Sequence, residues 1–284
     1  MAAWRKICFY HNRINNSSAA SFTATNSATG CPVTNLYDMS EINKWQALDT
    51  SSPQYITLDT GAGGVKTMAD YLCIYGHNLG TANAIDIVLQ YSEDGSTWTS
   101  AFTPFMAMGN DVILKEFTNP GSKRYWRLYF AGVSVIPYIT VCIWGMKTEL
   151  DYVSSGFDPY QQDVQANVNV SYGGALAGVH INYIQRLMNL FFADIKAVSS
   201  TTFADGTYLA NGSITAGNDE SPTVYEKTKH WWDNSSVNNF FVAWEIGNNS
   251  KDVFLMRPET GFNNPLKNGG IYRDINISLT GVSV

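Results

Sequence analysis

The sequence contains 284 residues, a length that fits two domains of ordinary size. Hydrophobic residues make up 45% and charged residues 15%, the latter below the roughly 25% of an average protein. The formal net charge is −6 and no basic cluster exceeds two residues, which argues against nucleic acid as a partner, because phosphate binding needs a concentrated basic surface. No apolar stretch is long enough to cross a membrane, so we expect no membrane insertion. The first residues contain no signal-peptide core, which leaves a leader removed beforehand or assembly in a cytoplasm.

The first half of the chain carries a dense series of strand signals. Residues 1–35 are a short apolar start followed by a small-polar tract that is typical of an extended surface segment. The strand segments that follow are 54–59, 71–75, 85–91, 124–130 and 138–144. Residues 92–95 (SEDG) form a hairpin turn in which the glycine adopts a positive φ. Short strands joined by frequent turns predict a mainly β protein with a sandwich or jelly roll.

A second pattern begins near residue 151 and predicts a further β-rich domain with one helix. Apolar residues alternate cleanly with polar ones from Val164 to Tyr172. Residues 184–198 fit either a helical stripe or a buried strand at 187–192 followed by a helix after residue 200, and periodicity does not decide between them. Strands are expected again at 240–245 and 271–279. We therefore predict one domain over residues 1–150 and another over residues 151–284.

Four cysteines, at positions 8, 31, 73 and 142, stand far apart and without metal-type spacing. Cys73 and Cys142 lie in apolar strand patterns, which favours buried thiols. The alternative is a Cys8–Cys142 disulfide that would join the two ends of the first domain.

Four motifs in residues 36–145 carry a family resemblance. Trp45-Gln-Ala precedes PQYITLDTG at 53–61, and YLCIYGHNL at 71–79 fits the next strand and loop. VLQYSEDGSTW at 88–98 and RYWRL at 124–128 complete the series. In this order the motifs resemble the discoidin-like family, also called coagulation-factor type C or galactose-binding-like, and the resemblance implies a jelly-roll sandwich.

The resemblance implies framework roles for most of the matched residues. Trp45 and Trp98 are expected to be apolar anchors of the sandwich, and Asp59 is expected to accept hydrogen bonds at a strand end. Asp94 and Gly95 would form the hairpin turn. Arg127 would pair with a carboxylate while its stem packs on an aromatic ring.

Two loops are candidates for ligand binding. Members of the family place a calcium-binding aspartate where this chain has Asp38. Calcium is therefore the one metal that the resemblance suggests. The chain departs from the family motif at Met39 and Asn43, which replace the usual Gly and Thr. No other cofactor is expected. His77 and Asn78 follow an apolar strand and, with Tyr37 as a stacking surface, could hold sugar hydroxyls. The alternative is that His77 and Asn78 only form a turn and cap local backbone.

No catalytic motif stands out, and the four histidines are scattered, so we expect no enzyme activity. The second half is similar to domains that accompany discoidin-like modules in tailed-phage structural proteins. This resemblance implies a virion component of the tail or baseplate, made in the host cytoplasm, whose partners are other virion proteins, copies of itself and host-surface carbohydrate. The alternative is a secreted lectin, or a carbohydrate-binding accessory module of a carbohydrate-active enzyme.

Overall fold

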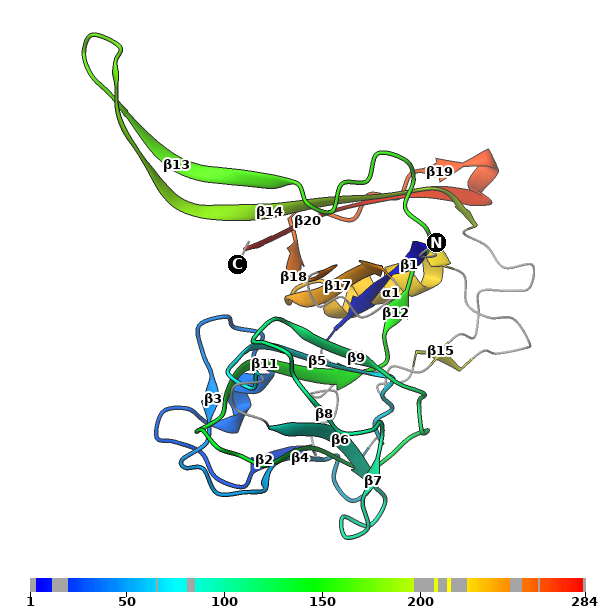
Figure 1. Cartoon of the computed structure of the whole chain (residues 1–284). Coiled ribbons are helices and arrows are strands. Elements are labelled where there is room, and N and C mark those ends of the chain that lie inside the picture. Colours follow the sequence, from blue (N-terminus) through cyan, green and yellow to red (C-terminus); the bar gives the residue numbers. More distant parts are fainter. Residues whose placement is uncertain are drawn as a thin grey trace.

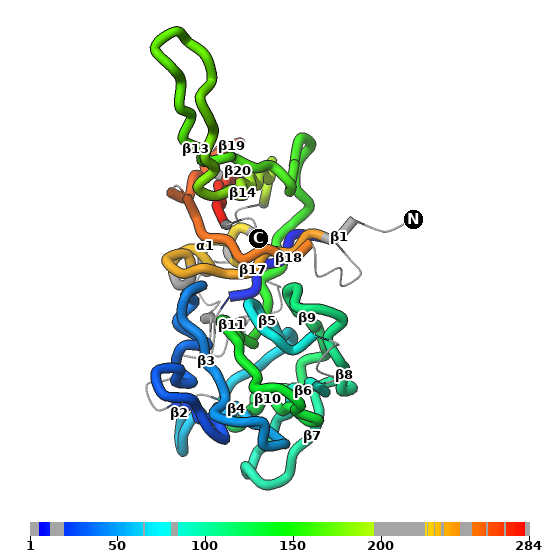
Figure 2. Tube along the Cα trace, turned by 60° about the vertical axis from the view of Figure 1, so that its left-hand side comes forward, coloured from blue at the N-terminus to red at the C-terminus, as the bar shows by residue number. Residues whose placement is uncertain are grey.

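The computed structural model describes residues 4–11, 20–64, 66–80, 85–196, 207–208, 214–215, 224–245, 252–259 and 261–282. The fold class predicted from the sequence is confirmed: the chain is mainly β, with a jelly-roll sandwich followed by a β-rich second part that contains one helix. Figure 1 and Figure 2 show the sandwich at one end, a central layer of strands beside it, and an outer layer from which a long hairpin projects.

The sandwich consists of two antiparallel sheets. The first contains β2 (Ser21–Ala24), β4 (Gln54–Asp59), β10 (Tyr125–Ala131), β6 (Asp86–Ser92), β7 (Thr99–Ser100) and β8 (Phe105–Met106). The second contains β3 (Trp45–Gln46), β11 (Tyr138–Gly145), β5 (Tyr71–His77) and β9 (Ile113–Glu116), and a short 3-10 helix, η1 (Val33–Leu36), contacts β11. In β4 and β10 every second residue is buried, as the alternation in the sequence predicts. The sandwich core therefore lies between the two sheets.

The remaining strands form an eight-stranded sheet that folds back on itself. Along it lie β12 (Thr148–Glu149), β1 (Trp4–Tyr10), β17 (Phe240–Glu245), β18 (Val253–Pro258), β20 (Tyr272–Val282), β14 (Leu176–Lys196) and β13 (Gln162–Val170), while β19 (Leu266–Lys267) pairs with β20. A separate pair is formed by β15 (Thr207–Tyr208) and β16 (Ile214–Thr215), and the helices are α1 (Val224–Ser235) and a 3-10 turn, η4 (Asn268–Gly270). The central layer is β12-β1-β17-β18, and the outer layer is β20-β14-β13.

The first strand of the chain belongs to the central layer. Cys8 pairs with Ala243 on one side and with Glu149 on the other, so β1 lies between β17 and β12. Residues 4–10 and 148–149, which the predicted boundary at residue 150 assigns to the first domain, thus complete a sheet of the second half. Whether residues 1–150 fold alone stays a prediction, and such a fragment would lack β17 beside β1.

The long strand β14 resolves the ambiguity left by the sequence at 184–198. Residues 184–196 are strand, not helix, and the buried ones are Met188, Leu190, Phe192 and Ile195; residues 197–206, where the alternative placed a helix, lie outside the described part of the chain. The step of three residues from Phe192 to Ile195 comes from an irregularity in the pairing with β20, where Asp194 adopts a φ of 54°. A bulge of this kind shifts the alternation of a strand, and the helix-like stripe combined residues of both faces, since Met188 is buried and Phe191 is exposed.

Two of the predicted buried thiols lie in the sandwich core. Cys73 and Cys142 are fully buried in β5 and β11, and burial raises the pKa of both thiols. Cys142 is a thiol and is not bridged to Cys8. These two cysteines are therefore apolar core residues.

A polar cluster connects the sandwich to β1. Tyr10 donates a hydrogen bond of 2.7 Å to Glu116 Oε1, which also pairs with the Lys147 ammonium at 3.0 Å. The backbone N–H of Lys147 donates to Asp70 Oδ1 at 2.9 Å. Burial raises the pKa of Asp70 to about 6, because desolvation of the carboxylate outweighs its contacts with Lys147, which lower the pKa. Ionised Asp70 is therefore a cost to the folded state at neutral pH.

Replacing this carboxylate with an amide should stabilise the protein at neutral pH. Because the pKa of Asp70 is raised on folding, the folded state binds more protons than the unfolded state between about pH 4 and pH 6, and stability falls as the pH rises through that window. Asp70→Asn should raise the Tm at neutral pH and change it little at about pH 4. Thermal unfolding followed by circular dichroism at both pH values measures this.

The matched control is Asp59→Asn, for which we expect a change in Tm of the opposite sign. Arg124 lowers the pKa of Asp59, so Asp59→Asn should lower the Tm at neutral pH. An Asp70→Asn protein that is less stable than wild type at neutral pH would contradict the assignment.

Candidate functional site

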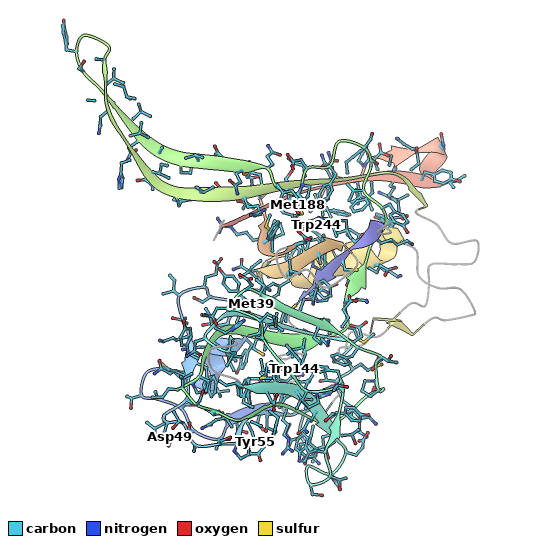
Figure 3. All side chains as sticks on the ribbon, in the orientation of Figure 1. Met39, Asp49, Tyr55, Trp144, Met188 and Trp244 are labelled. Carbon is cyan, nitrogen blue, oxygen red and sulfur yellow. The ribbon has the colours of Figure 1, made fainter. Side chains whose placement is uncertain are left out.

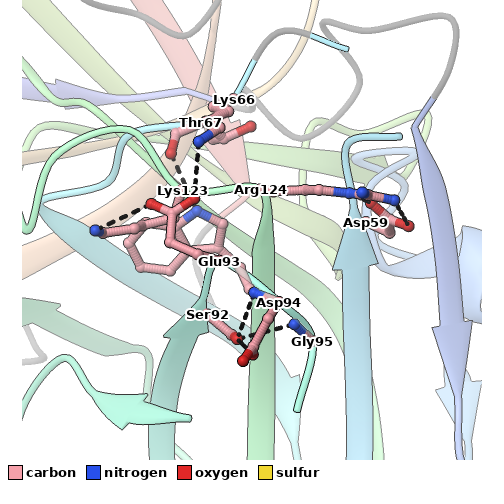
Figure 4. Close-up of polar contacts among 10 residues, drawn as sticks. Asp59, Lys66, Thr67, Ser92, Glu93, Asp94, Gly95, Lys123 and Arg124 are labelled. Atoms are coloured by element: carbon pink, nitrogen blue, oxygen red, sulfur yellow. Dashed lines mark hydrogen bonds and ion pairs between the residues drawn. The ribbon is translucent and has the colours of Figure 1, made fainter. Parts of the chain in front are cut away.

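The motif residues at the end of the first sheet form an ion-paired framework (Figure 4). Arg124 donates two hydrogen bonds to Asp59, from Nε to Oδ1 at 2.8 Å and from a terminal nitrogen to Oδ2 at 3.1 Å. The N–H of Gly61 also donates to Asp59 Oδ1. The Arg124 guanidinium holds the pKa of Asp59 below its usual range. Asp59 thus accepts the strand-end hydrogen bonds expected of it, and its partner is Arg124.

The predicted hairpin turn follows β6 directly. Asp94 Oδ1 accepts hydrogen bonds of 2.8 Å from the N–H groups of Ser96 and Thr97, and these contacts lower the pKa of Asp94. Gly95 has a φ of 73°, and a side chain at this position would meet the ring of Tyr125 at 3.3 Å. Asp94 and Gly95 therefore have local structural roles.

The two tryptophans of the motif lie in different environments. Trp45 is fully buried and stacks on Phe130 with ring centroids 6.3 Å apart, as expected of a core anchor. Trp98 is only half-buried and lies against Arg127, whose side chain points outward from β10. Trp98 is therefore a residue of the sheet surface, whereas the sequence predicted a core anchor.

Arg127 is the centre of a cluster that we name the aromatic platform: Tyr55, Gln90, Trp98, Arg127 and Tyr129. The Arg127 guanidinium carbon lies 4.0 Å from the Trp98 ring centroid, 4.6 Å from that of Tyr55 and 5.7 Å from that of Tyr129. Arg127 Nε donates a hydrogen bond of 2.7 Å to Gln90 Oε1. The arginine pairs with this amide, and not with a carboxylate as the sequence suggested.

Strand register explains why the platform forms. Arg127 is opposite Gln90 of β6, and Tyr129 is opposite Tyr55 of β4. Directly paired residues point to the same face of a sheet, and the alternate positions of β4 and β10 fill the core. The platform thus lies on the outer face of the first sheet. Figure 3 labels Tyr55 on the side of the sandwich that faces away from the second half of the chain.

The guanidinium of Arg127 retains unused donors. Burial against the rings lowers its pKa, with partial compensation from Tyr55 and Tyr129, and an arginine stays charged at neutral pH. Within the part of the chain that the structure describes, its terminal nitrogens make no hydrogen bond and it forms no ion pair. The platform therefore presents a cation and aromatic rings on one face.

The predicted ligand residues His77 and Asn78 are engaged within the chain. His77 is 2% exposed. Its Nδ1 accepts from the N–H of Leu79 at 3.1 Å, which requires Nε2–H to donate to the carbonyl of Asp111 at 2.8 Å. Asn78 donates to the carbonyl of Ile136 and accepts from the N–H of Tyr138. A ligand role would need these contacts to be released.

Tyr37 follows η1 and packs on the sandwich. Its ring packs edge-on against Phe22 at 5.1 Å, and Phe22 lies 5.7 Å from the ring of Trp144. Neither ring contact involves His77 or Asn78, and a sugar site shared by the three residues stays a prediction.

Asp38, the candidate calcium ligand, holds its own loop together. Its two carboxylate oxygens accept hydrogen bonds of 2.8 Å from the N–H of Ser40 and the amide of Asn43. In the described residues, no group of three His, Cys, Asp or Glu side chains is placed to hold a metal ion. The calcium site stays a prediction that rests on Asp38 and backbone carbonyls.

Comparisons with known proteins give low similarities. No family model matches the chain, and no curated protein matches it. Among solved structures, a chitosan-binding module of a chitosanase/glucanase from Paenibacillus sp. IK-5 is 17% identical with a TM-score of 0.40, over 48% of this chain and all of that one. A Clostridium perfringens module solved with GalNAc-β-1,3-galactose is 16% identical with a TM-score of 0.37, over 46% of this chain and 96% of that one.

A Ruminococcus gnavus fucosidase solved with fucose is 17% identical with a TM-score of 0.38, and the match covers 47% of this chain but 26% of the enzyme. Similarities this low do not transfer a ligand or an activity to the present chain. They give no support to a tailed-phage role. No described helix is long and apolar enough to span a membrane.

Removing the buried ring of His77 should destabilise the fold. His77→Ala leaves the N–H of Leu79 and the carbonyl of Asp111 without their partner, at a cost of about 1–3 kcal/mol. Burial lowers the pKa of His77, so its contribution is present above the ordinary histidine pKa of about 6.5 and is lost as the pH falls. Urea unfolding at neutral pH and at about pH 5 should show the larger loss at neutral pH.

His180→Ala is the matched control, because His180 is exposed on β14. It should leave the unfolding midpoint unchanged. Equal effects of the two substitutions would contradict a structural role that is specific to His77.

Proposed function

We propose that the sandwich is a non-catalytic glycan-binding module and that the aromatic platform is its ligand surface. The observation that carries the proposal is the environment of the Arg127 guanidinium and its unused hydrogen-bond donors. Its guanidinium is held among three aromatic rings on the outer face of a sheet, and its terminal nitrogens make no hydrogen bond within the described residues. Positioning a partly desolvated cation without a carboxylate partner has a cost, and an external acceptor would offset it.

The platform combines the two elements that sugar recognition needs. Half-buried rings of Tyr55, Trp98 and Tyr129 offer apolar surface for the C–H face of a pyranose. Tyr55 packs on Tyr129, and Trp98 packs on Arg127, which limits the entropy lost on binding. Gln90 and Arg127 supply directed polar groups beside these rings. A planar guanidinium with two donors available matches a carboxylate or sulfate in bidentate geometry. We therefore propose acidic glycans as the preferred class.

The loop residues His77, Asn78 and Tyr37 remain an alternative position for a sugar. The platform is favoured over them because His77 is buried with both ring nitrogens engaged, while the platform residues are only half-buried, on a face that no described layer covers. A single site of either kind should be weak, about millimolar, or −4 kcal/mol.

A second candidate function is contact with another protein subunit, as in the predicted virion role. Tryptophan, tyrosine and arginine are the residues most enriched among those that dominate protein–protein binding energies, and every platform residue except Gln90 is of one of these types. Under this alternative the partners are other assembly proteins and the location is a particle. Under the glycan proposal, the chain acts at a carbohydrate-bearing surface outside the cell.

Substitutions in the platform test the proposal. Arg127→Ala and Trp98→Ala should each weaken retention on immobilised acidic polysaccharides, such as polygalacturonate or a sulfated galactan, by at least tenfold in affinity, or about 1.4 kcal/mol. Arg127→Lys should restore only part of the affinity, because an ammonium cannot bind bidentately. Affinity electrophoresis on gels with and without polysaccharide measures the retention.

Tyr152→Ala is the control, since Tyr152 is an exposed aromatic residue in the second half of the chain. It should be retained like wild type. Wild-type protein that shows no retention on neutral or acidic polysaccharides would sink the glycan proposal. Loss of retention in His77→Ala, with normal retention in Arg127→Ala, would move the site to the loops.

A further inference from the structure

The hairpin formed by β13 and β14 extends beyond the rest of the sheet. β14 pairs with β20 from Gln185 to Lys196, but from Leu176 to Ile184 it pairs, among the described strands, with β13 alone. We name residues 164–184 the arm. Figure 1 and Figure 2 show it projecting away from both layers of the second half and from the sandwich. The arm is thus a two-stranded ribbon, and no other described segment covers either of its faces.

One face of the arm is apolar along its length. Val164 pairs with Ile184, Ala166 with Ile181, and Val168 with Val179, and paired residues share a face. Two bulges in β14 keep its apolar residues on this face although they do not alternate in sequence. The side chains that are at least half exposed on this face are Val164, Val168, Val170, Leu176, Val179 and Ile181. The opposite face is mostly polar and carries Gln165, Asn167, Asn169 and His180, together with Tyr183, which pairs with Gln165.

A two-stranded ribbon is at best marginally stable in water, and independent stability needs a third strand or a layer packed on the apolar face. Among the described residues no such layer packs on the arm, because six of its apolar side chains are at least half exposed. An additional layer on this face would therefore stabilise the arm.

The absence of charged residues from the arm limits which surfaces can pack against its apolar face. Residues 164–185 contain no Asp, Glu, Lys or Arg, although the chain carries 18 basic and 24 acidic residues in total. An occupant with charged groups would bury them against an uncharged surface without partners, which is costly. A second copy of the arm brings the same uncharged, apolar face, so the two faces match without repulsion despite the net charge of −6 on each chain.

We propose that the apolar face of the arm packs against the same face of the arm of a second copy of this chain. Such a contact is isologous: the two copies are related by a twofold axis, and each uses the same surface to contact the other. Two ribbons would stack about 10 Å apart, as sheets do in a sandwich. Six aliphatic side chains, each at least half exposed, amount to on the order of 600 Å² per copy, the lower end of what standard interfaces bury. The dimer is therefore reversible and depends on concentration.

The test compares two double substitutions at the same distance along the arm. Val168→Lys with Val179→Lys places two charges on the apolar face, and Asn167→Lys with His180→Lys places the same charges on the polar face, at neighbouring cross-strand positions. Sedimentation velocity over a hundredfold range of protein concentration measures the association. All of these residues lie outside both cores, so at concentrations where the wild type is monomeric each variant should have the same Tm as wild type.

The wild type and the polar-face variant should both dimerise, and the apolar-face variant should dissociate at least ten times more readily. A wild type that stays monomeric over the whole range would overturn the proposal. The proposal is also overturned if the apolar-face variant dimerises like wild type, since the contact then lies elsewhere, or if both variants dissociate equally, since the effect then reflects charge alone.

Discussion

The structure depends on a central layer of strands that is apolar on both faces. In β1, Tyr10 faces the sandwich and packs against Tyr71, while its neighbour Phe9 faces the outer layer and lies between the rings of Trp231 and Phe240. In β17, Phe241 belongs to the sandwich core and Phe240 to the outer core. Because strand residues alternate between faces, one continuous apolar segment serves two cores, and the N-terminal strand is needed by both halves of the molecule.

This arrangement explains which parts of the fold could be predicted from sequence. Alternation in residues 54–59 and 124–130 fixes which residues are buried in β4 and β10, because one face of each strand is solvated. The position of β1 could not be predicted in this way. Its partner β17 is more than two hundred residues away, and a short apolar segment contains no information about which strand it joins. The helix-like spacing that begins at Ile184 likewise combined exposed and buried residues of one strand and continued across the bulge at Asp194.

Part of the candidate site could be predicted from the sequence. The alternation of Arg127 with apolar neighbours places it on the outer face, and the same reasoning places Tyr55 and Tyr129 there. The position of Trp98 was not predictable, because it follows the turn at Asp94 and its orientation depends on Arg127 as a packing partner. His77 shows how a sequence motif can suggest a ligand residue where the structure has a structural one. A polar residue in a loop motif suggests ligand binding, but the His77 ring makes hydrogen bonds with two backbone groups. Polar residues near strand ends serve the backbone first when that backbone is buried.

The platform and the arm, the two surfaces that no described segment covers, lie at opposite ends of the molecule. This separation has a physical consequence. The platform is on the face of the sandwich that points away from the second half, whereas the arm projects from the outer layer (Figure 1, Figure 3). Contact between arms would therefore leave both platforms exposed. Two weak sites that are held in one particle bind a repetitive ligand with an effective concentration set by their spacing. A glycan of repeating units is such a ligand, so weak binding at each platform and a reversible contact between arms are compatible with strong attachment to a polymer and weak attachment to a free sugar.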